Sequence, residues 1–312
     1  TRLEFKILHD QLTPFGSLEL LARQVVEGFI TGMHKSPFHG FSVEFAEHRL
    51  YNRGESIRHI DWKLFGRTEK LFVKRFEEET NLRCQLVIDC SGSMLFPLNM
   101  KSGSGSLNKL AFSVYAAASL SELMRKQRDA VGLSLFDDSL RLHTRARTSR
   151  AHHQAIFVEL ERLLNQGTSA KNQTTAAAKA LHEIAERTHQ RSLVVIFSDL
   201  LDNEQPEEVF RALQHLRYNK HEVILFHVLD KATEELLDLE NRPYRFVDME
   251  TGEALRLNPV EIQDQYRKAM AERKIELRRK CAQYRIDLIE TDISRGYHAV
   301  LVEYLIKRSR LY

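Results

Sequence analysis

Asp89, Ser91 and Ser93 place one carboxylate and two hydroxyl groups at alternate positions of a short segment. The apolar run at 86–88 before them is typical of a buried strand, and a loop and a helix are expected after them. Open α/β sheets bind ligands where their parallel strands end. Small oxygen ligands of this kind can converge on one hard cation such as Mg²⁺. We therefore interpret the segment as part of a divalent-ion site.

Two later positions extend this candidate site. Thr175 precedes an expected helix, and Asp199 follows the apolar strand expected at 193–198. The set resembles the metal-ion-dependent adhesion site of von Willebrand factor A-like domains, in which the threonine stands six residues before a leucine. Leu181 then points to Thr175, with Thr174 as the alternative.

The resemblance implies a role for each of these side chains. Ser91 and Ser93 would bind the ion directly, and Thr175 would bind it directly or through water. Asp89 and Asp199 would mostly anchor water molecules. Mg²⁺ is the expected ion because the ligands are few and hard, with Mn²⁺ and Ca²⁺ as alternatives.

Apolar strands alternate with helices from residue 81 to residue 312, which predicts an α/β domain with a mostly parallel six-stranded sheet covered on both faces. An Asp-Asp-Ser turn at 137–139 makes the third strand antiparallel. The strands are expected at 84–88, 130–136, 140–144, 193–198, 222–228 and 286–290, with helices at 107–127, 151–164, 175–187, 207–217, 260–284 and 297–308. A hairpin insertion is expected near 243–257. Residues 1–80 form a separate N-terminal segment with a helix at 18–30 and short strands at 41–45 and 71–76.

A long stretch before the sheet carries a second resemblance. Residues 40–79 include the run His-Ile-Asp-Trp-Lys and lead into the Asp-x-Ser-x-Ser-Met segment. This stretch resembles the bacterial family catalogued as domain of unknown function 58. Asp-Ala-Val-Gly-Leu-Ser-Leu-Phe at 129–136 and Phe-Ser-Asp-Leu at 197–200 resemble later blocks of that family. Glu55 and Ser56 replace two common aspartates, and Gly66 replaces an alanine.

The family resemblance implies a von Willebrand factor A-like domain without established catalytic activity, often encoded beside a MoxR-type AAA+ ATPase. Many members carry membrane helices ahead of the signature, and this chain resembles the form without them. We therefore expect a protein–protein interaction module. Its ion site and the charged segment 44–67 would face a bacterial partner, most plausibly a MoxR-type ATPase.

Composition excludes several other classes of protein. The 312 residues are 43% hydrophobic, and 46 basic residues nearly balance 43 acidic ones, so neither disorder nor a nucleic-acid partner is indicated. The apolar runs are strand-sized, well below the roughly 20 residues that a membrane span requires. Three scattered cysteines suit neither a disulfide framework nor a zinc ribbon. They indicate a reducing compartment, and we expect the cytoplasm.

The alternative function is a metal-dependent phosphoester hydrolase. Its general base would be Asp137, Asp138 or Asp202. The chain has no P-loop, and neither Ser91 nor Ser93 lies in a G-x-S-x-G motif.

Other polar and aromatic positions have structural interpretations. Trp62 is expected to anchor a core, and His152 and His153 to open a solvated helix. The basic face at 267–280 is interpreted as solvated, with an anionic membrane or nucleic acid as the alternative. A further set of charged residues is expected to form an ion-pair network or, alternatively, a partner-docking surface. This set comprises Glu44, Glu47, Arg49, Arg53, Arg58, Asp61 and Arg67.

Overall fold

The structure is a computed structural model that describes residues 17–32, 44–51, 60–77, 82–98, 107–166, 177–200, 206–248 and 252–309. The chain divides into two compact units. The larger comprises Thr1–Pro37 together with Arg83–Tyr312, and the smaller comprises Phe38–Leu82.

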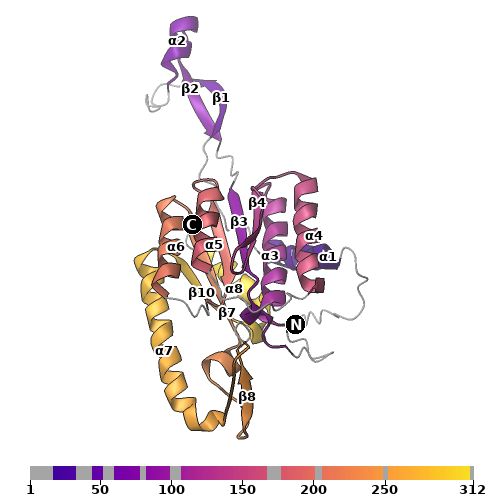
Figure 1. Cartoon of the computed structure of the whole chain (residues 1–312). Coiled ribbons are helices and arrows are strands. Elements are labelled where there is room, and N and C mark those ends of the chain that lie inside the picture. Colours follow the sequence, from indigo (N-terminus) through magenta and orange to yellow (C-terminus); the bar gives the residue numbers. More distant parts are fainter. Residues whose placement is uncertain are drawn as a thin grey trace. The chain divides into compact units, whose positions relative to one another are not determined.

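The larger unit is built on a six-stranded sheet in the order β10-β7-β6-β3-β4-β5 (Figure 1). Its strands are β3 (Arg83–Asp89), β4 (Ala130–Phe136), β5 (Leu140–His143), β6 (Leu193–Ser198), β7 (Glu222–Leu229) and β10 (Asp287–Asp292). Neighbouring strands are parallel except β4 and β5, which are antiparallel. The predicted α/β fold is confirmed, including the central parallel pair of β3 and β6 and the antiparallel edge strand.

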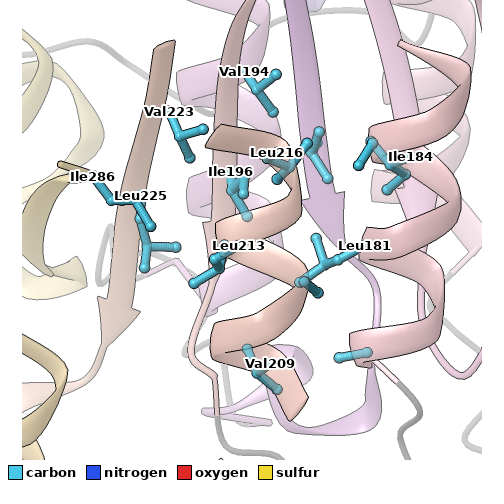
Figure 2. Close-up of a cluster of buried hydrophobic side chains, with 14 of the residues drawn as sticks. Leu181, Ile184, Val194, Ile196, Val209, Leu213, Leu216, Val223, Leu225 and Ile286 are labelled. Atoms are coloured by element: carbon cyan, nitrogen blue, oxygen red, sulfur yellow. The ribbon is translucent and has the colours of Figure 1, made fainter. Parts of the chain in front are cut away.

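Helices cover both faces of this sheet. On one face α3 (Lys109–Lys126) packs on β3 and β4, with α1 (Ser17–Gly32), α4 (Arg150–Gln166) and α8 (Tyr297–Ser309) against it. On the other face lie α5 (Ala177–Arg187) and α6 (Pro206–Tyr218). Figure 2 shows Leu181 and Ile184 of α5 and Leu213 of α6 directed toward Val194 and Ile196 of β6. Both faces of the central strands are therefore buried, which explains their continuous apolar sequences.

The helix α1 belongs with the sheet, although the sequence analysis placed it in a separate segment at 1–80. Its apolar residues Leu18, Leu21 and Val25 are buried, and the helix packs on α3. Charged groups also join the two helices, because Lys126 pairs with Glu27 at 3.6 Å. The boundary between the compact units accordingly lies at residues 37–38 and 82–83.

The smaller unit contains an antiparallel pair, β1 (Glu44–Leu50) and β2 (Phe72–Glu77), and the short helix α2 (Trp62–Thr68). The prediction that Trp62 anchors a core is wrong, because its side chain is 61% exposed. No residue of α2 is buried, and the indole meets Phe65 edge-on with ring centroids 6.1 Å apart. Arg53 and Arg58 lie outside the described residues, as do the positions 41–43 of the expected first strand.

The two histidines at the start of α4 and the expected hairpin both lie in the larger unit. The solvated helix start at His152 and His153 is wrong, because His153 is 2% exposed and His152 Nε2 lies 2.9 Å from the carbonyl oxygen of Val131. The helix α4 that carries both rings packs on α3 and β4. A hairpin is present near 243–257, formed by β8 (Tyr244–Val247) and β9 (Ala254–Leu257).

The long helix α7 (Pro259–Gln283) packs on β10. Its basic face is mostly exposed, with ion pairs from Lys274 and Arg278 to Glu290. Within the described ranges, no helix combines the length and the apolar character needed to span a membrane.

Gly132 on β4 is required by close packing. A Cβ at this position would lie 2.6 Å from the carbonyl oxygen of Thr144 and would collide with the side-chain oxygen of Gln85. Overpacking of a dense core costs about 1–3 kcal/mol. We expect Gly132→Ala to lower the free energy of unfolding by about this amount in urea denaturation.

Gly66→Ala is the matched control, because no atom lies within 4 Å of its Cβ position and alanine favours the helix. An equal loss of stability in both variants would contradict the packing explanation.

Candidate functional site

The candidate site lies where β3 and β6 end side by side. The parallel register pairs Ile88 with Phe197, so that Asp89 and Ser198 follow at neighbouring positions. The Ser198 hydroxyl donates a hydrogen bond of 2.6 Å to Asp89 Oδ2, and both residues are buried. Sequence reasoning missed Ser198 because a serine at a strand end gives no signal by itself. We call this edge the rim, comprising residues 89–93, Ser198 and Asp199.

The loop after β3 brings two hydroxyl groups together. The Ser91 N–H donates to Asp89 Oδ1 at 2.9 Å, which fixes the start of the turn η3 (Gly92–Leu95). The Oγ atoms of Ser91 and Ser93 then lie 3.1 Å apart. Two adjacent oxygen ligands in an octahedral Mg²⁺ site are about 2.8–3.0 Å apart, given bonds of 2.0–2.1 Å. The two serines therefore fit the predicted divalent ion.

Asp199 is held by a lysine that the sequence analysis did not consider. Lys109 Nζ lies 2.7 Å from Asp199 Oδ2 and 2.5 Å from Glu234 Oε1, and the lysine side chain is fully buried. Lys109 is the first residue of α3, whereas Glu234 belongs to η4 (Lys231–Glu235), which follows β7. The available signal was a lysine at the start of a mostly apolar helix.

Burial controls the ionisation of these groups. Burial first, and then the charge of Asp199, raise the pKa of Asp89 to about 7, while the hydrogen bonds from Ser198 and Ser91 act in the opposite direction. For Lys109, burial lowers the pKa, but the carboxylates of Asp199 and Glu234 outweigh it and the net shift is upward. The ammonium therefore stays charged.

A histidine supports the same strand end. Burial lowers the pKa of His227 to about 4, so the ring is neutral near pH 7. Its Nε2 lies 2.9 Å from the carbonyl oxygen of Asp199. Since a carbonyl oxygen only accepts, Nε2 is the donor. This contact fixes the backbone that carries Asp199.

Other predicted site residues are placed differently. Thr175 and its alternative Thr174 lie outside the described residues, as does Asp202. Asp137 accepts a hydrogen bond from the Ser139 N–H and forms an ion pair with Arg141. It is therefore already neutralised by a neighbouring cation.

Across the part of the chain that the structure describes, no group of three His, Cys, Asp or Glu side chains is placed to hold a metal. The predicted set contains two such residues, Asp89 and Asp199, beside its hydroxyls. The support for an ion consequently comes from the serine pair and the loop geometry.

Two uncharacterized proteins, from Mycobacterium bovis and Mycobacterium tuberculosis, are each 25% identical to this chain over 294 residues. These matches cover 94% of this chain and 88% of each relative. Among solved structures, BatB from Bacteroides thetaiotaomicron aligns with 13% identity and a TM-score of 0.42, covering 73% of this chain and 99% of that one. An aerotolerance-related membrane protein from Bacteroides fragilis gives 14% and 0.45, covering 74% of this chain and all of that one.

The family model described as protein of unknown function DUF58 matches residues 47–279. That range includes β3, β6 and both ends of the rim described above. The resemblance stated from the sequence is thus confirmed, and the chain belongs to the DUF58 family.

Proposed function

We propose that this protein is a non-catalytic interaction module that binds another protein through a divalent ion held at the rim. The observation that carries the proposal is the pair of hydroxyl groups of Ser91 and Ser93, 3.1 Å apart and held by Asp89. Their spacing is close to that of adjacent ligands of Mg²⁺.

The distribution of charge at the strand ends supports the same proposal. Acids follow three adjacent strands, namely Asp137 after β4, Asp89 at the end of β3 and Asp199 after β6. Arg141 pairs with Asp137, and Lys109 pairs with Asp199. The central acid, Asp89, accepts hydrogen bonds from neutral N–H and hydroxyl donors. A bound cation at the rim would give Asp89 the positive neighbour that Asp137 has in Arg141 and Asp199 has in Lys109.

A bound ion would supply a Lewis-acidic position with room for a ligand from outside the chain. Both oxygens of Asp89 already accept internal hydrogen bonds, so this residue suits contacts to the ion through water. The serines contribute neutral oxygens. A carboxylate from a partner protein would therefore be the strongest ligand, which favours an acidic contact residue on the partner.

The partner that the family resemblance favours is a MoxR-type AAA+ ATPase. The cytoplasm is the compartment that we propose for this complex. In support, Cys84, Cys90 and Cys281 are all buried free thiols. Burial raises the pKa of Cys281 to about 12, so its thiol stays protonated and unreactive.

We expect calorimetry with MgCl₂ or MnCl₂ to show one site on the wild-type chain. Ser91→Ala/Ser93→Ala should weaken binding by roughly tenfold or more, because two of the few direct ligands are lost. Ser294→Ala is the control, since it removes an exposed hydroxyl that follows β10 at the edge strand of the sheet. Equal heats for the wild type and the double variant would exclude the serines as ligands.

Binding to a MoxR-type ATPase is tested by co-purification with and without EDTA. We expect EDTA or the Ser91→Ala/Ser93→Ala double substitution to release the ATPase, and added Mg²⁺ to restore only the wild-type complex. Retention of the ATPase under both treatments would contradict an ion-mediated contact. It would leave the charged segment 44–67 as the remaining candidate surface.

A further inference from the structure

Contacts hold Lys109 both at its backbone and at its ammonium group. Its backbone N–H donates to the carbonyl oxygen of Phe96 at 3.0 Å, at the end of the loop that carries the two serines. Its ammonium lies 5.9 Å from the centre of the Phe96 ring, with Asp199 and Glu234 as its ion-pair partners. A buried ammonium is expensive unless it is paired and hydrogen-bonded, and here both carboxylates meet that need.

The position of this charge matters more than its pairing. Asp199 follows Ser198 directly, and Ser198 donates to Asp89, the residue that holds the serine loop. A cation attached to Asp199 consequently acts on the same region as a divalent ion at the serines.

We propose that Lys109 is a specificity-determining residue of the rim, which keeps Asp199 from the ion and adds a fixed positive charge that favours an anionic partner group. This inference rests on the proposed function. Lys109 lies outside the predicted ligand set. In this proposal its charge sets the balance between the affinity for the ion and the affinity for the partner. Lys109 engages one oxygen of Asp199 at 2.7 Å, an oxygen that a divalent ion or its water would otherwise use.

The two consequences have opposite signs. Removing the ammonium lifts its repulsion of a divalent ion and releases an oxygen of Asp199, so the ion should bind more tightly. The same change removes a positive charge from the loaded rim, so a carboxylate from outside should bind less tightly. A purely structural role for Lys109 predicts instead that both kinds of binding weaken together.

Three variants separate these explanations. Lys109→Met keeps an unbranched side chain of similar length and removes the charge. Glu234→Gln removes a negative charge while Lys109 keeps its contact with Asp199. The combined variant restores the charge balance. Each is titrated calorimetrically with MgCl₂, in sodium acetate and in sodium chloride of equal ionic strength, with acetate as the probe for a partner carboxylate.

We expect Lys109→Met to bind Mg²⁺ roughly tenfold more tightly, Glu234→Gln to bind it several-fold more weakly, and the combined variant to resemble the wild type. Acetate should tighten Mg²⁺ binding in the wild type, more so in Glu234→Gln and least in Lys109→Met, because linkage is reciprocal. Weaker or unchanged Mg²⁺ binding by a folded Lys109→Met would overturn the inference. Should that variant not fold, tighter binding by Glu234→Gln would overturn it.

The outcomes distinguish this inference from the proposed function. Mg²⁺ binding that depends on Ser91 and Ser93 but not on the charge at Lys109 would leave the ion site standing and remove the role of the lysine. Binding by Lys109→Met alone would support the inference and show that the native chain does not hold the ion. Absence of binding in every variant would overturn both.

Discussion

The parallel pairing of β3 with β6 is the constraint on which the rim depends. Its register sets Ile88 beside Phe197, and the hydrogen bond from Ser198 to Asp89 closes the pair at the carboxyl end. A shift of one residue would exchange the two faces of a strand. Asp89 would then lose the hydrogen bond that it accepts from Ser198. The buried apolar residues on both faces of these strands make such a shift unfavourable, so packing of the core fixes the geometry of the site.

Burial of acids at the rim creates an electrostatic problem that the fold solves with side chains from distant segments. Asp89 and Asp199 raise the free energy of each other's charged form, and the pKa of Asp89 rises to about 7 as a result of burial and this repulsion. Lys109 from α3 and Glu234 from η4 complete an ionic cluster that joins both segments to the end of β6. Breaking such a buried pair by removing one partner costs about 3–5 kcal/mol. The same contacts that could bias ligand binding therefore also hold the helix start in place.

The sequence was informative where a pattern is local and the burial is complete. Continuous apolar runs marked the central strands, and their ends located Asp89 and Asp199 at one edge of the sheet. Lys109 and Glu234 could not be found in this way, because they are 90 and 35 residues from Asp199 in the chain and meet it only through the fold. Trp62 shows the reverse error: a general preference of tryptophan for the core was applied to a short helix that buries none of its residues.

The contacts of the acids around the rim also bear on the choice between binding and hydrolysis. A hydrolase needs a base that can accept a proton near the ion, whereas Asp137 is paired with Arg141 and Glu234 with Lys109. His227 is neutral near pH 7, but its Nε2 donates to the backbone of Asp199. Each of these three groups already stabilises the structure in its present protonation state. Protonation of Asp137 or Glu234 would weaken the ion pair that each forms, whereas His227 keeps a lone pair on Nδ1 because its proton is on Nε2.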